Sequence, residues 1–587
     1  MTELPVATVF IVGALVLPLL PSSVRRFFFI AVPVAGFALL LQQQPDTSLT
    51  VPFLEYELVV NRVDRLSLVF GYIFTIVTFL GGIYAFHLRD VGEQVAALLY
   101  AGCSLGVVFA GDLFTLFVFW EFMAVASVYL VWARRTAESR GAGMRYLMVH
   151  LFGGSVLLAG ILLHWGETGS FAFTLMEGGL GAWLILIAFT LNAAVPPLHA
   201  WLPDAYPAAT VTGAVFMSAF TTKTAVYALA RGFAGWELLL WAGVIMALYG
   251  VAFAVLENDI RRLLAYHIVS QVGYMVAGVG LGTEMAINGV TAHAFCHILY
   301  KALLFMGAGA VLYTVGTSKL TELGGLAKAM PVTFALYMVG GFSISGVPLF
   351  NGFISKSMIV SAAEVNHEYV AFLLLTMASI GTFLHTGLKL PYFTWFGPQR
   401  SLQPARVPTG MHVGMGLTAA LCVAIGVFPT LLYQQLPFAV DYRPYTIPHV
   451  VQTVQLLAFT ALAFFLLRSW LGGEAKITLD TDWVYRRGVG PAYAIGVAAP
   501  AWIFTQSDRL ATAFVHRLAR VAANPTGHLL DLQNALRRAT SGTLREAGVL
   551  PAFDPDVYRP PVAAVILVIL LFFAVLASLN LCGAMPR

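Results

Sequence analysis

Residues 286–313 read AINGVTAHAFCHILYKALLFMGAGAVLY, an apolar run that is long enough to cross a bilayer as an α-helix. The run carries three ionisable side chains, His293, His297 and Lys301, at spacings of four residues. Four residues turn an α-helix by about 400°, so the three positions lie on one face of the predicted helix. Ionisable groups are costly inside a membrane and usually serve a function there. This stretch therefore predicts a membrane span with a polar face.

Similar apolar runs recur along nearly the whole chain of 587 residues, of which 59% are hydrophobic and 11% are charged. Soluble domains carry about 25% charged residues. The runs are continuous rather than alternating, which excludes membrane barrel strands of about 10 residues. The sequence therefore predicts an all-α polytopic membrane protein with about 14–17 transmembrane helices. The predicted spans are residues 5–20, 24–41, 66–86, 95–111, 113–132, 145–165, 181–202, 211–230, 238–256, 262–282, 286–313, 332–362, 371–396, 411–431, 450–470 and 561–582.

The charges of the loops predict the orientation, because Lys and Arg favour the cytoplasmic side of a membrane. The odd-numbered loops carry most of the basic residues, which are Arg25, Arg26, Arg89, Arg134, Arg135, Arg140, Arg261, Arg262, Lys319, Lys328, Arg400 and Arg406. The even-numbered loops carry mainly acids, which are Asp46, Glu55, Glu57, Glu167, Glu177, Glu284, Glu364 and Glu368. This alternation predicts a multi-pass protein of the cell inner (plasma) membrane with its N-terminus outside. No basic region precedes Val6–Leu20, so we interpret this run as a retained span rather than a cleaved signal.

Composition divides the chain into five predicted parts. Residues 1–94 are N-terminal membrane helices, residues 95–397 a core, and residues 398–472 additional membrane helices. Residues 473–560 are a basic amphipathic segment on the cytoplasmic side, and residues 561–587 are a last membrane helix.

The basic segment predicts an amphipathic helix that lies along the membrane surface or against a partner. Leu510, Phe514, Leu518 and Val521 follow helical spacing. The arginines of the segment are Arg486, Arg487, Arg509, Arg517, Arg520, Arg537, Arg538 and Arg545. Residues 491–505 are apolar enough for an additional span, which would change the side of the C-terminus.

Two predicted spans contain helix breakers. Residues 192–204 read NAAVPPLHAWLPD and residues 343–356 read SISGVPLFNGFISK. Non-helical backbone at membrane depth occurs only inside protein or beside water, and paired broken helices indicate an inverted repeat. The sequence thus predicts two inverted repeats, residues 95–235 and 236–397. Proline-kinked helices without a role in transport are the alternative interpretation.

Further ionisable residues within the predicted spans extend the polar face of residues 286–313. The main candidates are Glu121, Lys223 and Lys356, and the additional ones are His150, His267 and Lys389. Burial brings the pKa of amines and carboxyls towards neutrality, and histidine already titrates there. Such groups, bridged by water, form a proton relay. The alternatives are a Lys389 that extends its ammonium to the interface, packing histidines at 150 and 267, and a structural ion pair for Glu121.

No cofactor is predicted. The sequence has no dinucleotide or P-loop phosphate motif. Its cysteines, Cys103, Cys296, Cys422 and Cys582, lie in apolar runs and form no CxxC, which argues against an iron–sulfur or zinc site. We find no nucleophile–base–oxyanion set, and nothing predicts a nucleic-acid partner.

Several motifs resemble one known family in the same order. They are FWE (119–121), PPLHAWLPDAYP (196–207), TKTAVY (222–227), DIRRLLAYHIVSQVGY (259–274), HAFCH (293–297), KALLF (301–305) and GFISK (352–356). Residues 98–397 resemble the antiporter-like subunits of the membrane arm of respiratory complex I and of Mrp-type cation/proton antiporters, where the D subunit is most similar. The resemblance implies that Glu121 couples neighbouring subunits, that Lys223 carries the proton at the centre, that residues 293–301 link the halves, and that Lys356 lies near the exit.

The sequence departs from this family at Asn192. Many members place a lysine there, before the Pro-Pro break, as the ion-pair partner of the glutamate. Asparagine carries no charge, so Glu121 pairs with His150 or Lys223 instead, or the half of the channel that takes up protons is altered or lost.

The resemblance leaves three functions open. The first is a proton-translocating subunit of a multisubunit Na+/proton antiporter, with other hydrophobic subunits as partners and the bilayer as its medium. The second is a proton-pumping subunit of a complex I-like oxidoreductase or membrane-bound hydrogenase, in which the basic segment braces neighbouring subunits. The third, suggested by Asn192, is a non-conducting scaffold. The first two are ion-transport roles, and only the second would belong to a redox enzyme.

Overall fold

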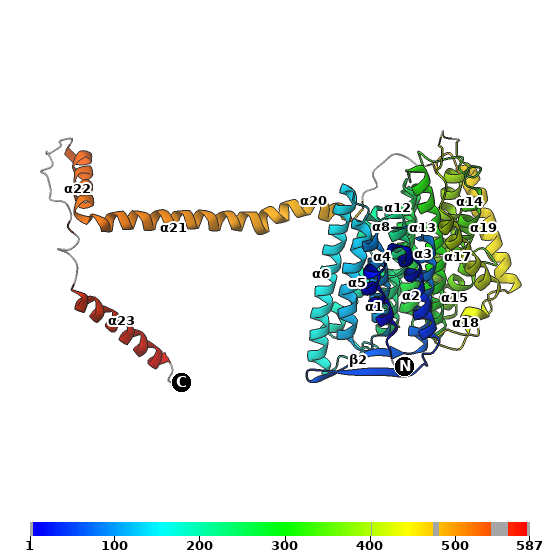
Figure 1. The fold of residues 1–587 in the computed structure, drawn as a ribbon, viewed down its shortest axis with the longest axis horizontal. Helices are drawn as coiled ribbons and strands as arrows, with labels where there is room; N and C mark the ends of the chain where they lie inside the picture. Colours follow the sequence, from blue (N-terminus) through cyan, green and yellow to red (C-terminus); the bar gives the residue numbers. More distant parts are fainter. Residues whose placement is uncertain are drawn as a thin grey trace. The chain divides into compact units, whose positions relative to one another are not determined.

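The computed structural model describes residues 4–398, 400, 402–472, 480–541, 554 and 561–583. The chain divides into two compact units, Met1–Asp482 and Trp483–Arg587. The first unit is a bundle of helices that run side by side, with a two-stranded hairpin at the end where the N-terminus lies (Figure 1).

Within the described residues, 12 helices are long and apolar enough to cross a membrane, and four shorter apolar helices accompany them. The predicted class, a polytopic all-α membrane protein, is confirmed. Each predicted span coincides with one helix or with consecutive helical segments. In the first unit these are α1 (Val6–Val16), α2 (Ser22–Leu40), α3 (Arg65–Tyr84), α4 (Val91–Phe109), α5 (Leu113–Trp132), α6 (Ala137–Thr168), α7 (Leu180–Asn192), α8 (Trp201–Ala208), α9 (Val211–Ala219), α10 (Thr221–Gly232), α11 (Glu237–Leu256), α12 (Ile260–Leu281), α13 (Glu284–Val315), α14 (Pro331–Ser345), α15 (Asn351–Val365), α16 (Tyr369–Thr382), α17 (Thr409–Val427), α18 (Thr430–Tyr433) and α19 (Ile447–Leu467).

Side-chain caps fix where many of these helices begin. Asp64, Asp112 and Asp259 accept hydrogen bonds from the first backbone N–H groups of α3, α5 and α12. Thr136 and Thr283 do the same for α6 and α13. Such caps satisfy donors that have no partner within the helix, so the loop residues set the start of each span.

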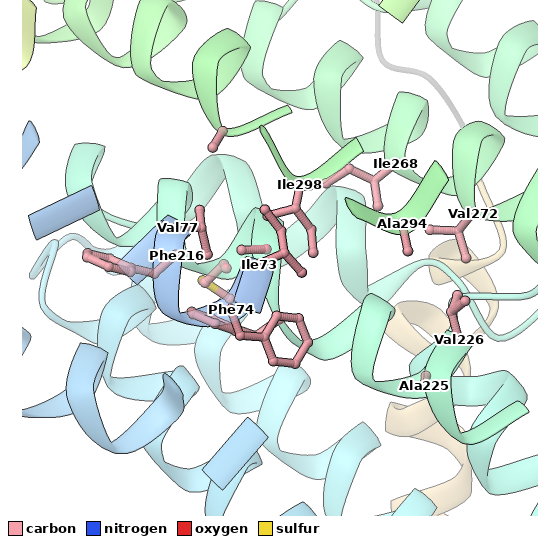
Figure 2. Close-up of a cluster of buried hydrophobic side chains, with 14 of the residues drawn as sticks. Ile73, Phe74, Val77, Phe216, Ala225, Val226, Ile268, Val272, Ala294 and Ile298 are labelled. Carbon is pink, nitrogen blue, oxygen red and sulfur yellow. The ribbon is translucent and has the colours of Figure 1, made fainter. Parts of the chain in front are cut away.

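The centre of the first unit is formed by α12 and α13, whose side chains are almost all buried. Figure 2 shows an apolar cluster at this centre, to which α3, α9, α10, α12 and α13 contribute. Its labelled members are Ile73, Phe74, Val77, Phe216, Ala225, Val226, Ile268, Val272, Ala294 and Ile298. The cluster packs the helices that carry His267, Lys223 and the α13 residues against one another.

Two helices are interrupted where the breakers predict. α7 ends at Asn192 and α8 begins at Trp201, and Ala194 between them has a φ of 61°. α14 is followed by Gly346, whose φ of 73° lies in the left-handed region that glycine adopts readily. α15 then begins at Asn351.

A third interruption was not predicted. α9 ends at Ala219 and α10 begins at Thr221, because Phe220 between them has φ −97° and ψ −74°. Residues 217–224 contain neither proline nor glycine, so the sequence gives no breaker signal here. The interruption leaves backbone carbonyls at the end of α9 without helical partners.

Two further features were not predicted. β1 (Thr47–Phe53) and β2 (Tyr56–Val63) form an antiparallel hairpin in what the sequence indicated only as an acidic loop. The helix that begins as α16 continues in π-helical turns over Phe383–Lys389 and Tyr392–Phe396. Such turns are frequent at functional sites, and the first of them carries Lys389.

The second unit is helical wherever it is described as regular structure: α20 (Asp482–Tyr493), a π-helical turn (Ala494–Ala498), α21 (Ala499–Ala523), α22 (Pro525–Ser541) and α23 (Val562–Gly583). Residues 510–521 are helical, within α21, and the apolar side chains at 510, 514, 518 and 521 are exposed. That this face lies along a membrane surface or against a partner stays a prediction. The predicted additional span, 491–505, lies in the helical stretch Asp482–Ala523, which is one of the 12 candidate spans. Residues 473–479, 542–553 and 555–560 of the basic segment, Arg545 among them, lie outside the described residues.

Candidate functional site

Glu121 lies on α5 and faces α6 at Gly154. A Cβ atom on Gly154 would lie 1.6 Å from Oε1 of Glu121, so this glycine makes room for the carboxylate. Oε1 is buried, and no group among the described residues donates a hydrogen bond to it. Neither ion pair expected for Glu121, with His150 or with Lys223, forms in the part of the chain that is described.

His150 pairs with Asn192 instead. Nδ1 of His150 on α6 lies 2.9 Å from Oδ1 of Asn192, the last residue of α7. The imidazole also packs against Tyr146 and Trp201, with ring centroids 4.2 Å and 4.6 Å away. The other ring nitrogen, Nε2, is buried without a hydrogen-bond partner among the described residues. Packing against aromatic rings therefore does not by itself account for a histidine at this position.

Lys223 is fully buried on α10, next to the unpredicted interruption. Its Nζ donates hydrogen bonds to the carbonyl oxygen of Ser218 at 2.6 Å and to Oγ1 of Thr222 at 3.1 Å. The Ser218 carbonyl belongs to the last turn of α9, where the broken helix frees acceptors. The interruption thus supplies hydrogen-bond acceptors for a buried amine.

His293, His297 and Lys301 are fully buried on α13. Nδ1 of His293 lies 3.0 Å from Oγ of Ser355 on α15, and its Nε2 lies 3.4 Å from the hydroxyl of Tyr300. In contrast, both ring nitrogens of His297 and Nζ of Lys301 are without hydrogen-bond partners among the described residues. Buried polar groups of this kind are normally satisfied by water.

His267 on α12 contacts a histidine that was not among the predicted site residues. Its Nε2 lies 2.9 Å from Nδ1 of His385, which is in the first π-helical turn. Lys389, one turn further on, donates hydrogen bonds to the carbonyls of Val255 at 2.5 Å and Glu257 at 3.4 Å. Lys389 therefore binds the C-terminal end of α11, where free carbonyls favour a cation.

Lys356 lies on α15 beside the break that precedes this helix. Its Nζ is 3.4 Å from the carbonyl oxygen of Ile344 and 5.9 Å from the centre of the Tyr274 ring. The side chain also lines a cavity of about 410 Å³. Other residues of the cavity wall are Ser345, Ser357, Glu364, Thr376, Ser379, Arg443 and His449.

The buried groups are close enough to sense one another. Electrostatic interactions join His297 to Lys223, Lys301, His293 and His267, join His293 to Lys356, and join His385 to Lys301 and Lys389. His297 is thus the centre of the group, because three other main candidates, Lys223, His293 and Lys301, interact with it directly. In the described residues no cluster of three or more His, Cys, Asp or Glu side chains is arranged to hold a metal ion. The titratable nitrogen and oxygen atoms of the buried groups are chemically suited to proton transfer.

Comparison with known proteins decides the family. Residues 110–383 match the family described as "NADH:quinone oxidoreductase/Mrp antiporter, TM". An uncharacterized protein of Methanocaldococcus jannaschii is 31% identical over 385 residues, which cover 60% of this chain and 79% of that protein. The chain belongs to this family.

Two relatives with named functions differ in how much of the chain they match. An Na(+)/H(+) antiporter subunit of Alkalihalophilus pseudofirmus is 32% identical over 487 residues, which cover 71% of this chain and 60% of the relative. Hydrogenase-4 component B of Escherichia coli is 29% identical over 586 residues, which cover 87% of this chain and 85% of the relative. The chain thus spans less than two thirds of the antiporter subunit.

A solved structure shares the fold of this chain. In the structure of the Mrp complex from Dietzia sp. DQ12-45-1b, one chain superposes with a TM-score of 0.65 at 22% identity, covering 78% of this chain and 98% of that one. The expected resemblance to Mrp-type antiporter and complex I subunits is confirmed.

Two residues of the site were missed because their partners are remote in sequence. His385 is one histidine in an apolar run, and its partner His267 is 118 positions away. His199 was noted only as part of a motif, yet it contacts Asp480, 281 positions away. A histidine within a predicted span was the available signal in both cases.

Proposed function

We propose that this chain is a proton-translocating subunit of a multisubunit monovalent cation (Na+)/proton antiporter. The observation that carries the proposal is the row of buried ionisable groups on α13, which interacts electrostatically with both Lys223 and Lys356. An apolar bundle has no structural need for unpaired amines and imidazoles, which are costly to bury. The antiporter name of a relative that matches 71% of this chain supports the same function.

In this proposal Lys223, His297, His293 and Lys356 pass protons stepwise. Lys223 holds a proton on Nζ against the Ser218 carbonyl and releases it when a neighbouring charge changes. His297 and Lys301 have no protein partner in the described part of the chain and exchange protons through bridging water. His293 passes the proton to Lys356, with which it interacts electrostatically and which lines the cavity. Glu121 and the additional candidates His150, His267 and Lys389 modulate this path, and Asn192 replaces a charge with a fixed hydrogen bond to His150.

The domain organisation fits the same mechanism. From α4 onward, the fourth span of the first predicted repeat is the broken α7–α8 pair, and the fourth span of the second is the broken α14–α15 pair. Inverted repeats with broken helices at matching positions are typical of transporters. We also propose that the N-terminus and the hairpin lie outside, as the loop charges predict.

The decisive test is transport by the reconstituted complex. Glu121→Gln and Lys301→Ala each remove one proton-binding group and should lower proton/cation exchange by about tenfold or more. Glu138→Gln and Lys328→Ala change the same residue types at exposed positions and serve as matched controls. Exchange equal to the parent in both Glu121→Gln and Lys301→Ala would refute the relay and would favour a non-conducting scaffold.

A second candidate function is favoured by one observation. The hydrogenase component matches 87% of this chain, more than the antiporter relative does, so its match reaches into the C-terminal unit. The same relay would then be driven by electron transfer within a redox complex. Loss of quinone-linked or hydrogenase activity on deletion of the gene would support this function, and unchanged activity would exclude it.

A further inference from the structure

Asp480, near the end of the first unit, places its carboxylate among groups that are far from it in sequence. Its Oδ2 accepts a hydrogen bond from the hydroxyl of Tyr266 at 2.5 Å and lies 3.1 Å from Nε2 of His199. Its Oδ1 accepts a hydrogen bond from the hydroxyl of Tyr249 at 2.5 Å. The side chains of His199 and Asp480 are 0% and 1% exposed, so this is a buried, fully engaged carboxylate.

The three partners come from three different elements. His199 lies in the break between α7 and α8, Tyr249 on α11 and Tyr266 on α12. The next residue, Thr481, adds a hydrogen bond from its Oγ1 to the carbonyl of Pro197, 3.2 Å away in the same break. The segment at 480–481 thus contacts the break at two points, the imidazole of His199 and the backbone carbonyl of Pro197.

The carboxylate is ionised in this setting. Burial alone raises the pKa of Asp480, but its hydrogen bonds with His199, Tyr249 and Tyr266 and its electrostatic interaction with His199 outweigh burial and lower it. A buried charge is tolerated when it is paired and hydrogen-bonded, and removal of such a partner leaves polar groups unsatisfied. The contact is therefore specific for a carboxylate.

The break that Asp480 reaches is connected to the candidate site. Trp201, at the start of α8, donates a hydrogen bond from its indole to the carbonyl of Leu191 and packs against His150. His150 in turn holds Asn192 at the end of α7. α8 is fixed further along by Asp204, which binds Arg145 of α6 through two hydrogen bonds of 2.7 and 2.9 Å.

We propose that Asp480 is a positioning residue that fastens the segment leading into the C-terminal unit to the break between α7 and α8. The chain passes from Asp482 directly into Trp483, the first residue of that unit. A displacement of the C-terminal unit is transmitted through Asp480 and Thr481 to His199, and from there to the His150–Asn192 pair. The test of this inference by ion exchange rests on the proposed translocation function. Its test by cross-linking, which measures whether the segment at 480–481 stays attached to the break, does not.

Docking is measured by cross-linking the full chain in its native membrane complex. Leu198→Cys and Thr481→Cys place thiols on the two sides of the contact, in a background in which Cys582 is replaced by serine, and a short bifunctional maleimide joins them. Cross-linking should be efficient with Asp480 present and should fall about tenfold with Asp480→Ala, because hydrogen bonds to a charged group are lost. Asp480→Asn keeps the size and part of the hydrogen bonding and should give an intermediate yield. Asp508→Asn, an exposed acid on α21, is the matched control and should change nothing.

Transport is measured on the same variants without the added cysteines. Asp480→Ala should slow proton/cation exchange, Asp480→Asn should restore part of it, and Asp508→Asn should match the parent. Cross-linking unaffected by Asp480→Ala would overturn the anchor. Lost cross-linking with exchange equal to the parent would overturn the positioning role. Absence of exchange in the parent itself would count against the proposed function, while the cross-linking result would still decide the anchor.

Discussion

Gly154 is the single residue whose identity is most closely tied to the position of Glu121. Alanine at this position would place a methyl group 1.6 Å from Oε1 and 2.4 Å from the carboxyl carbon. The carboxylate is the end of a flexible side chain, so it moves aside and the fold survives. We therefore expect Gly154→Ala to lower exchange as Glu121→Gln does, while the yield of folded protein stays close to that of the parent. Exchange in proteoliposomes and elution on size exclusion measure the two effects.

Gly166→Ala is the control for this substitution. Gly166 lies on the same helix, α6, and a Cβ there meets nothing within 4 Å. Both substitutions raise helix propensity by the same amount, so a difference between them isolates the contact with Glu121. Normal exchange in Gly154→Ala would mean that the placement of the carboxylate is unimportant.

The sequence identified the charged members of the site more readily than their partners. Glu121, Lys223, Lys301 and Lys356 are visible because a charge stands out in an apolar run. Their environments were not predictable. The Ser218 carbonyl is an available acceptor only because the helix is interrupted at Phe220, and no proline or glycine marks this interruption in the sequence. Partners such as Asp480 come from distant parts of the chain, and pattern alone contains no information on which of them meet.

At the scale of elements, one ion pair joins the start of α3 to the end of α10. Asp64 caps α3 and also accepts a hydrogen bond of 2.6 Å from Arg231, in the last turn of α10. Burial raises the pKa of Asp64, but the charge of Arg231 and the hydrogen bond from Ser67 outweigh it, so the net pKa is lowered. A carboxyl whose pKa is depressed on folding stabilises above its unfolded pKa of about 3.9 and loses this contribution as the pH falls through the folded value.

We therefore expect Asp64→Asn to lower the unfolding temperature at neutral pH, and the difference from the parent to shrink below about pH 4. Thermal unfolding of the detergent-solubilised protein over a pH series measures this. Glu55→Gln changes an exposed acid between the hairpin strands and serves as control. A difference that stays constant down to the acid limit would show that the charge of Asp64 is not what stabilises the contact.

Helical elements were predictable to the extent that their signals are local. Apolar length identified the spans, and the Pro-Pro and Ser-Gly-Val-Pro segments identified two of the breaks, since both act on the backbone where they stand. The interruption at Phe220 and the π-helical turns around His385 depend on packing against neighbouring helices. The hairpin of β1 and β2 was not predicted, because the acidic residues of 47–63 indicate a loop and carry no signal for strand pairing.

At the scale of the whole molecule, the two candidate complexes require different partners. An antiporter driven by an ion gradient needs only other membrane subunits, whereas a redox-driven pump needs flavin or iron–sulfur subunits that supply electrons. The match of the hydrogenase component to 87% of this chain and the antiporter match to 71% leave both assemblies compatible with the fold. The relay in this chain is the same in either case, so the two complexes differ in their subunit composition.

Purification from native membranes distinguishes them directly. We expect a colourless complex in which mass spectrometry finds only hydrophobic antiporter-type subunits, because the proposed relay needs a charge change in a neighbouring membrane protein but no electron carrier. Deletion of residues 483–587 is a useful comparison, because neighbours that bind the C-terminal unit should then be lost while the first unit remains in the membrane. A brown sample with the absorption of iron–sulfur clusters would contradict this prediction and would show that the chain belongs to a redox-driven pump. In that complex Asp480 would connect the break between α7 and α8 to a segment that responds to electron transfer.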